Sequence, residues 1–137
     1  MVQLVSLQKI KEILEQSRRI AVVGLSPKPD RPSHRVAAYL INAGYEVVPV
    51  NPGHETILGL TCYPDLKSVP GTVDIADIFR RSEQVMPVVV QAIDKKIPVI
   101  WMQQGIVNRE AAELAEQRGI TVIMDRCIQI DHRDSMR

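Results

Sequence analysis

The stretch RIAVVGLSPKPDRPSHR, residues 19–35, decides how this chain folds. Its first part, residues 20–24, is a short apolar run rich in branched side chains, which predicts a buried strand. A turn follows at Gly24-Leu25-Ser26, and the loop after it is rich in proline and in basic residues. Ser33 is predicted to cap the next helix. A strand, a glycine turn, a basic loop and a helix N-terminus in this order are typical of a site for a phosphate-bearing anion.

The length of 137 residues indicates one domain, residues 1–137, with a core of its own. The chain is 45% hydrophobic but only 4% aromatic, so its core consists of Val, Ile, Leu and Ala, the usual material of a parallel sheet covered by helices. The formal net charge of +1 gives no overall attraction to nucleic acid or to a membrane, and we expect neither as a partner. Phosphate binding must therefore rest on local placement of Lys and Arg.

The two cysteines, Cys62 and Cys127, form no disulfide framework and no metal-binding spacing, so we expect reduced thiols. Charged residues interrupt the apolar runs near the N-terminus, which is unlike a signal peptide, and no apolar run reaches the length of a membrane span. These features predict a cytoplasmic protein.

Strands and helices alternate along the chain. The main strands are predicted at residues 20–24, 45–50, 73–79, 97–102 and 120–124, and the helices at 7–16, at 33–42, after Ser82 and after Asn108. Residues 57–60 are predicted to add a short strand, and residues 125–137 to form a polar C-terminal tail. This order is typical of an α/β fold, here a Rossmann-like, doubly wound, mainly parallel five-stranded sheet with helices on both faces.

A few residues mark the helix ends. Ser6 is predicted to cap the first helix, whose apolar face includes Leu7, and Gly44 to end the second. The third helix has two possible starts. Ser82 resembles a cap, but Pro87 would then lie deep in the helix, so a later start is the alternative.

In such a sheet the ligand lies beyond the carboxyl ends of the strands, where the strand order reverses. The residues that follow the strands here are mostly polar and basic, which suits a nucleotide with phosphates. The candidate cofactor-binding residues are Gly24, Leu25, Ser26, Lys28, Ser33, Arg35, Asn51, Pro52, Phe79, Arg80, Gln103, Gln104 and Gly105.

The first loop matches neither of the two common nucleotide motifs. Ser26 stands where a G-x-G-x-x-G fingerprint needs its second glycine, and no G-K-[ST] follows. The second strand ends in Val50-Asn51-Pro52, without the carboxylate that usually holds the ribose of NAD. A ribose that carries a phosphate, as in coenzyme A, needs basic partners instead. Candidate partners are Lys28, Arg31, Arg35 and Arg80, although each of them is also a plausible solvated surface charge.

Two further features fit a coenzyme A ligand. An adenine ring could stack on Phe79 or on the adjacent Arg80, with a core phenylalanine as the alternative. Residues 103–105, Gln-Gln-Gly, could form hydrogen bonds to an amide-bearing chain such as pantetheine, with an ordinary polar loop as the alternative.

No catalytic constellation is found, and we predict no catalytic residue and no metal site. The three histidines, His34, His54 and His132, are scattered, and the G-x-S-x-G nucleophile motif is absent. Cys127 is the one possible nucleophile near the ligand-binding edge, but a structural cysteine is the favoured interpretation.

Several short motifs together are specific for one family. They are Gly24-Leu25-Ser26, Pro32-Ser33, residues 45–52 (YEVVPVNP), Ile57-Leu58-Gly59, Val73-Asp74-Ile75, Phe79-Arg80-Arg81, residues 100–105 (IWMQQG) and Asp125-Arg126-Cys127. In these motifs the chain resembles the small stand-alone coenzyme A-binding proteins, whose fold is similar to the nucleotide-binding domain of the succinyl-CoA synthetase α subunit.

The resemblance implies three groups of ligand contacts. Gly24, Ser26, Lys28 and Ser33 would meet the phosphates, Asn51, Pro52, Phe79 and Arg80 would surround the adenosine, and residues 103–105 would face the pantetheine arm. None of the three histidines matches the context of the synthetase's phosphorylated histidine, so a complete acyl-CoA ligase is not predicted.

The sequence thus predicts binding of coenzyme A or an acyl-CoA without catalysis. Two alternatives stay open: an NAD(P)-dependent oxidoreductase, and a regulatory protein whose nucleotide pocket is unused. A homo-oligomer also stays open, because Trp101 is expected either in the core or at a subunit contact.

Overall fold

The structure is a computed structural model that describes residues 2–136. Its centre is a five-stranded, all-parallel sheet with the strand order β2-β1-β5-β6-β7. The strands are β1 (Arg19–Val23), β2 (Glu46–Val50), β5 (Ile75–Ile78), β6 (Val99–Met102) and β7 (Thr121–Met124). The predicted fold class is confirmed, and each strand lies within its predicted range except for β1, which starts one residue earlier and ends one residue earlier. The strand order reverses between β1 and β5.

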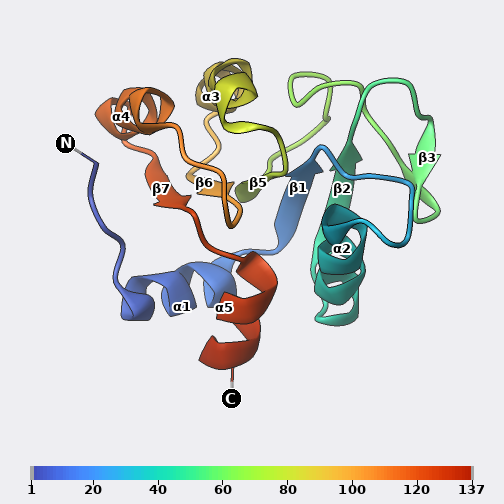
Figure 1. Ribbon diagram of the computed structural model, residues 1–137, viewed down its shortest axis with the longest axis horizontal. Helices are drawn as coiled ribbons and strands as arrows, with labels where there is room; N and C mark the ends of the chain where they lie inside the picture. Colours follow the sequence, from blue (N-terminus) through green and yellow to red (C-terminus); the bar gives the residue numbers. More distant parts are fainter. Residues whose placement is uncertain (1, 137) are drawn as a thin grey trace.

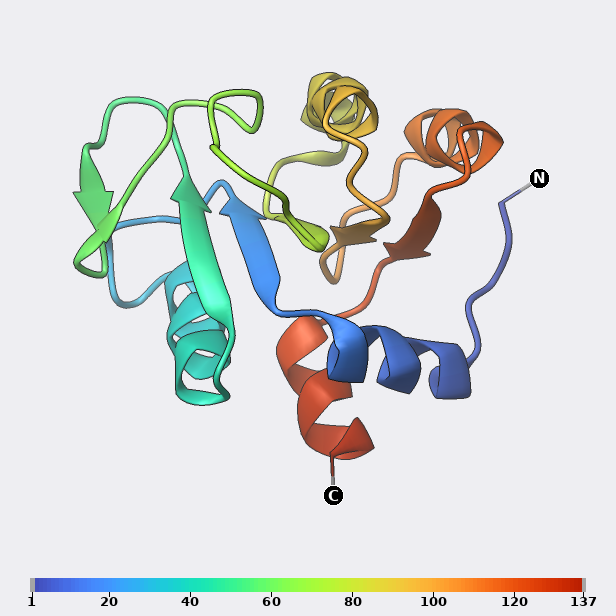
Figure 2. The same ribbon diagram turned by 180° about the vertical axis from the view of Figure 1, so that it is seen from behind.

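Helices cover both faces of the sheet (Figure 1). They are α1 (Leu7–Gln16), α2 (Pro32–Asn42), α3 (Val85–Asp94), α4 (Arg109–Gln117) and α5 (Ile128–Ser135). Figures 1 and 2 show α3 and α4 on one face and α1, α2 and α5 on the other. Each face has its own cluster of buried aliphatic side chains, because the strand residues point alternately to either side. None of the helices within residues 2–136 combines the length and the apolar character that crossing a membrane requires.

Three helix ends follow the sequence prediction. The Ser6 hydroxyl accepts a hydrogen bond from the Lys9 N–H, and the Asn108 side chain accepts one from the Ala111 N–H. Gly44, which follows the C-cap Ala43 of α2, has a φ of 101°, the left-handed conformation that ends helices. Local residue types therefore set these boundaries.

The start of α2 differs from the prediction. The helix begins at Pro32, and its N-cap is Arg31, whose side chain makes no capping bond. Proline is well suited to this first position, because its fixed φ is helical and its missing N–H would have no partner there. Ser33 consequently lies inside the first turn and is buried, with its hydroxyl available to another part of the chain.

The third helix takes the later of its two predicted starts. A short 3-10 turn, Ser82–Gln84, precedes α3, which begins at Val85. Pro87 therefore falls in the first turn, where no intrahelical N–H bond is lost. In α1, by contrast, Leu7 does not join the apolar face as predicted and is 68% exposed.

Two other segments also differ from the prediction. Residues 57–60 do not form a single strand; they belong to a hairpin of β3 (Thr56–Ile57) and β4 (Leu60–Thr61). The two residues at its turn, Leu58 and Gly59, have φ values of 56° and 71°, as a tight type I′ turn requires. Most of the predicted polar tail is the helix α5, whose Ile128 is fully buried.

Candidate functional site

The site lies where the β1 and β5 strands end side by side. Gly24 follows β1 with a φ of +89°, and its N–H donates to the Val50 carbonyl of β2 at 2.8 Å. A Cβ atom at this position would overlap the backbone carbonyl of Phe79, which follows β5. Only glycine allows the segments after β1 and β5 to approach this closely. The first segment then continues toward α2 and the second toward α3.

The loop after Gly24 is held in place by its own side chains. The Ser33 hydroxyl accepts a hydrogen bond from the Ser26 N–H at 2.9 Å, and the Ser26 hydroxyl accepts one from the Lys28 N–H at 3.1 Å. Nδ1 of His34 lies 2.9 Å from the Ser26 carbonyl oxygen, so Nδ1 carries the donated proton. Asn51, after β2, donates from its side chain to the Leu25 carbonyl. The loop is therefore ordered before any ligand arrives.

Three adjoining cavities share Phe79 as a wall residue. The basic cavity, about 350 Å³, lies over the loop and is lined by Gly24, Ser26, Lys28, Arg31, Pro32, Ser33 and Phe79. The apolar cavity, about 560 Å³, lies between α2 and α5 and is lined by Pro32, Arg35, Val36, Phe79, Gln103, Gln104, Ile106, Cys127, Gln129 and Ile130. The arginine cavity, about 470 Å³, is lined by Phe79, Arg80, Arg81, Ser82, Glu83, Gln104, Gly105 and Ile106.

The three cavities differ in their chemistry. Lys28 and Arg31 enter no ion pair within residues 2–136, so their charges are available to an anion. Arg81 is paired only loosely with Glu83, at 3.7 Å and largely in solvent. The apolar cavity has one charged side chain, Arg35, whose Nη1 donates to the Asp30 carbonyl. One ligand with a strongly anionic part and a mainly apolar part would suit this arrangement.

Helix α5 forms one wall of the apolar cavity and is tied to the sheet by polar contacts. The Oε1 atom of the buried Gln103 accepts a hydrogen bond from the first helical N–H, that of Ile128, at 3.0 Å. Asp131, one turn into the helix, accepts two hydrogen bonds from the Arg126 guanidinium, at 2.7 and 2.8 Å. The carbonyl of Arg126 in turn accepts the indole N–H of Trp101.

Ten of the thirteen predicted site residues line these cavities. Four are in the basic cavity (Gly24, Ser26, Lys28, Ser33), four have contacts with the apolar cavity (Arg35, Phe79, Gln103, Gln104), and two are in the arginine cavity (Arg80, Gly105).

The other three predicted residues lie outside the cavity walls. The Leu25 side chain is fully buried in the core beneath the loop. Asn51 supports the loop from behind through its bond to the Leu25 carbonyl, and Pro52 is exposed in the turn after β2.

Sequence reasoning missed the residues that α2 and α5 add to the apolar cavity, namely Pro32, Val36, Gln129 and Ile130, together with Ile106. Val36 was predicted only as part of a helix, and Pro32 only as part of the preceding loop and of a family motif. The sequence of α5 shows no helical spacing of apolar residues. This short helix is held instead by contacts with residues distant in the sequence, such as Gln103. The apolar cavity could therefore not be found from the sequence.

Titratable groups with shifted pKa values lie mostly away from the three cavities. Burial lowers the pKa of His132, which packs edge-on against Tyr39 and Tyr45 and lies 2.8 Å from the Tyr39 hydroxyl. Burial is also the main cause that raises the pKa of Tyr45 to about 12. Asp77, in the middle of β5, is fully buried, and burial raises its pKa well above the usual range. No group of three or more His, Cys, Asp or Glu residues within residues 2–136 is arranged to hold a metal ion.

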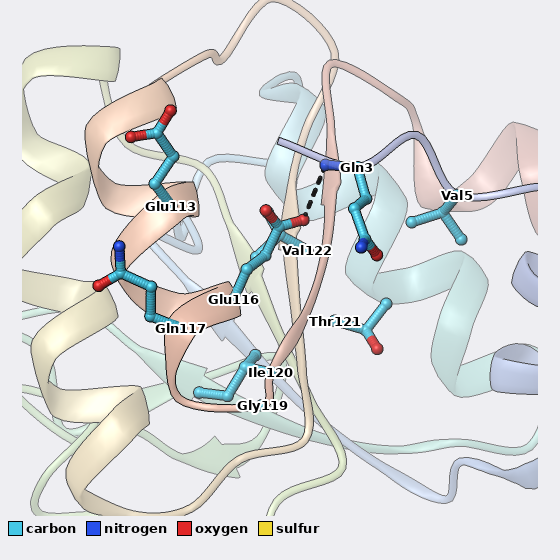
Figure 3. A pocket seen from close by; sticks show the side chains of 9 residues that line it. All are labelled: Gln3, Val5, Glu113, Glu116, Gln117, Gly119, Ile120, Thr121 and Val122. Atoms are coloured by element: carbon cyan, nitrogen blue, oxygen red, sulfur yellow. Dashed lines mark hydrogen bonds between the residues drawn. The ribbon is translucent and has the colours of Figure 1, made fainter. Parts of the chain in front are cut away.

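A further cavity, of about 420 Å³, lies at the end strand β7, between α4 and the segment before α1 (Figure 3). Figure 3 shows the Gln3 N–H donating to Glu116, with Glu113 on the same helix. The residues that line this cavity include two carboxylates and no Lys or Arg. It is therefore unsuited to a phosphate.

Comparison with known proteins gives a consistent result. Residues 18–133 match the family described as CoA binding domain. An uncharacterized protein of Bacillus subtilis, YneT, is 49% identical over 124 residues, which cover 90% of this chain and 92% of that protein. A solved structure of a hypothetical protein from Pyrococcus horikoshii superposes with a TM-score of 0.95 at 38% identity and covers 97% of this chain and 94% of that one.

The chain is also similar to one part of a much larger enzyme. It is 30% identical over 120 residues to the ADP-forming acetate–CoA ligase I of Archaeoglobus fulgidus. The aligned segment is 80% of this chain but only 17% of the ligase.

Proposed function

The chain belongs to the CoA binding domain family, and from that premise we propose that it binds coenzyme A or an acyl-CoA and performs no reaction on it. The observation that carries the proposal is the meeting of a basic, an arginine-rich and a mainly apolar cavity at one side chain, Phe79. Coenzyme A has three parts of matching chemistry: a pyrophosphate, a phosphorylated adenosine and a pantetheine arm.

Each part of the ligand is assigned to one cavity. The pyrophosphate lies on the loop, where Lys28 and Arg31 supply positive charge and the N-terminus of α2 supplies its dipole. The adenosine lies beside Phe79, with Arg80 available to its 3′-phosphate. The pantetheine arm enters the apolar cavity, where Gln103 and Gln104 offer hydrogen bonds to its amides.

The polar groups of the loop are suited to binding rather than to nucleophilic attack. The hydroxyl of Ser33 accepts the Ser26 N–H, and the hydroxyl of Ser26 accepts the Lys28 N–H. Neither hydroxyl is hydrogen-bonded to a histidine, since His34 binds the Ser26 carbonyl instead. These contacts support a role in holding a ligand.

An NAD(P)-dependent oxidoreductase is the less favoured alternative. In proteins that bind NAD, a carboxylate after the second strand usually holds the ribose hydroxyls. Here that position is Asn51, and its amide nitrogen is occupied by the Leu25 carbonyl. The position supports the loop and has no carboxylate to offer to a ribose.

Isothermal titration calorimetry with three ligands tests the proposal. Coenzyme A is expected to bind more tightly than dephospho-coenzyme A, because the latter lacks the 3′-phosphate that Arg80 would contact. NADPH is expected to bind more weakly than either. Equal affinities for the first two would refute the assignment of the adenosine, and tighter binding of NADPH would refute the proposed ligand.

A charge-removing variant tests the basic cavity. Lys28→Ala is expected to weaken coenzyme A binding by about 1–3 kcal/mol, or roughly 5- to 150-fold in Kd, through loss of one charge-assisted hydrogen bond. Lys9→Ala is the matched control, because Lys9 is exposed on α1 and lines none of the three cavities. An equal effect of both substitutions would mean that the phosphates bind elsewhere.

A further inference from the structure

Asp125, the first residue after β7, has a strained backbone. Its φ is 61°, a left-handed conformation that costs energy for any residue with a side chain, although Asp and Asn tolerate it best. Two other non-glycine residues within residues 2–136 have a positive φ, and both have a local reason for it. Leu58 lies in the β3–β4 turn, and Lys96 follows the C-cap of α3. Asp125 lies in no hairpin and ends no helix, so its conformation needs another explanation.

The side chain of Asp125 is bound to the loop that follows β6. Its Oδ1 atom accepts a hydrogen bond from the Gly105 N–H at 2.6 Å. A carboxylate acceptor makes such a bond short and strong. Asp125 lines none of the three cavities, whereas Gln104 lines both the apolar and the arginine cavity. The carboxylate can therefore influence the cavities only through the loop that it holds.

Residues 103–106 form a tight turn whose central peptide has two possible orientations. The Ile106 N–H donates to the Gln103 carbonyl at 2.9 Å, and Gly105 has a φ of 87°, as the third residue of a type II turn requires. A type I turn has the same closing bond, but its central peptide, here the one between Gln104 and Gly105, is turned over. The bond to Asp125 selects the first of these two orientations.

The same bond also fixes the direction of a carbonyl group. The N–H and the C=O of a trans peptide point in opposite directions. Because the Gly105 N–H faces Asp125, the Gln104 carbonyl faces away from Asp125. The turn thus has a hydrogen-bond acceptor of fixed direction at the residue shared by the apolar and the arginine cavity.

We propose that Asp125 is a positioning residue of the ligand site. It holds the Gln104–Gly105 peptide so that the Gln104 carbonyl accepts a hydrogen bond from an amide N–H of the pantetheine arm. This inference rests on the proposed function. The strained φ of Asp125 is the cost of placing Oδ1 against Gly105. In return, the acceptor is oriented before the ligand arrives, so binding does not have to order the peptide.

Two substitutions separate the hydrogen bond from the backbone strain. Asp125→Gly accommodates the positive φ but has no acceptor, whereas Asp125→Asn tolerates the same φ and keeps an acceptor oxygen. In calorimetric titrations we expect Asp125→Gly to raise the Kd of coenzyme A roughly 3- to 10-fold, as for the loss of one hydrogen bond. Asp125→Asn should restore the Kd to within about twofold of the wild type.

A truncated ligand and an NMR signal test the assigned role more directly. Adenosine 3′,5′-bisphosphate lacks the pantetheine arm, so its Kd should change by less than about twofold in either variant. The amide proton of Gly105 should shift upfield in Asp125→Gly, because it loses a short hydrogen bond, and should return toward the wild-type position in Asp125→Asn. A merely structural role would weaken both ligands alike.

The possible outcomes distinguish this inference from the proposed function. Equal losses of coenzyme A affinity in the two variants, an equal loss for the truncated ligand, or an unchanged Kd in Asp125→Gly would overturn the inference alone. If the wild-type protein does not bind coenzyme A, the proposed function is overturned as well.

Discussion

Gly24 connects the architecture of the sheet with the candidate site. Its positive φ turns the chain out of β1, and its missing side chain leaves room for the Phe79 carbonyl. The same close approach brings the loop after Gly24 and Phe79 to the walls of one cavity. A single residue thus sets both the end of a central strand and the distance between two parts of the site.

Replacing Gly24 tests this dual role. Gly24→Ala is expected to destabilise the fold by about 2–4 kcal/mol. The new methyl group would overlap the Phe79 carbonyl, and the alanine backbone would be held at an unfavourable positive φ. Urea unfolding monitored by the fluorescence of Trp101, the only tryptophan, measures the change.

Gly53→Ala is the matched control for this substitution. Gly53 also has a positive φ, of 86°, but a Cβ atom there meets nothing within 4 Å. We expect a loss of only about 1–2 kcal/mol, due to the backbone conformation alone. Equal losses for Gly24→Ala and Gly53→Ala would show that the contact with Phe79 relaxes without cost.

Helix α5 shows how an element with weak intrinsic tendencies is held by its neighbours. It has only eight residues, too few for stability in isolation. Gln103 from the end of β6 satisfies its first N–H, and the Arg126–Asp131 pair closes its first turn. Its position between α1 and α2 then completes the apolar cavity.

Breaking the tether of α5 should loosen this wall. Asp131→Asn removes a carboxylate that is 8% exposed and accepts two bonds from a guanidinium that is 42% exposed. We expect a loss of about 1–2 kcal/mol, less than for a fully buried pair, because water can solvate the released Arg126. Hydrogen exchange should become faster over residues 128–135, and coenzyme A should bind more weakly.

The exposed pair at the end of the same helix is the control. Arg133 lies 3.7 Å from Asp134, and both side chains are more than half exposed. Arg133→Ala is expected to change stability by less than about 0.5 kcal/mol. If Asp131→Asn behaves in the same way, the tether does not hold the helix.

We expect the stability of the whole molecule to depend on pH through Asp77, a residue in its central strand. Asp77 lies in β5 between Val22 of β1 and Trp101 of β6, and all three are fully buried. Neither oxygen of its carboxyl group has a hydrogen-bond partner within residues 2–136. Burial therefore raises the pKa of Asp77 in the folded state, since the charged form is poorly solvated there.

The sign of the effect on stability follows from proton binding. Above the usual pKa of 3.8 the unfolded chain has lost this proton while the folded chain keeps it, so stability falls as pH rises. The slope for one proton is at most about 1.4 kcal/mol per pH unit. Asp77→Asn removes the titration, so its stability relative to the wild type should increase steadily from pH 4 upward in urea unfolding series. A difference that does not change with pH would show that Asp77 keeps an ordinary pKa.

Asp65 is a control of opposite sign. Hydrogen bonds from the side chain and the backbone of Ser68 lower its pKa. Its contribution is present above the usual pKa and is lost as pH falls through the folded value. Asp65→Asn should therefore differ from the wild type most at neutral pH and least in acid.

Much of this architecture could be read from local patterns. The five strands are apolar because both of their faces are covered. Capping residues in the sequence mark the starts of the helices α1 and α4. Gly24, Ser26 and Lys28 could be assigned to the ligand edge because parallel strands bring their carboxyl ends together. Such features depend on residues close in the sequence or on a rule common to all sheets of this type.

Other features depend on contacts between distant residues. Ser33 was predicted to cap α2, yet its hydroxyl binds the Ser26 N–H, and Pro32 starts the helix. The side chain of Leu25 is buried beneath the loop, so only its backbone is left for the predicted ligand contact. A sequence pattern does not reveal which way a loop side chain points, because that direction follows from the packing of the whole loop.

The sequence by itself determined the fold class, the edge of the sheet at which the candidate site lies and the basic character of the loop, since periodicity, turn residues and charge are local properties. The tertiary structure alone decided that three cavities meet at Phe79, that α5 exists, and that Cys127 lies in the apolar cavity. Those features arise where segments some 25 to 100 residues apart are packed together, as in the bonds from Gln103 to Ile128 and from Tyr39 to His132.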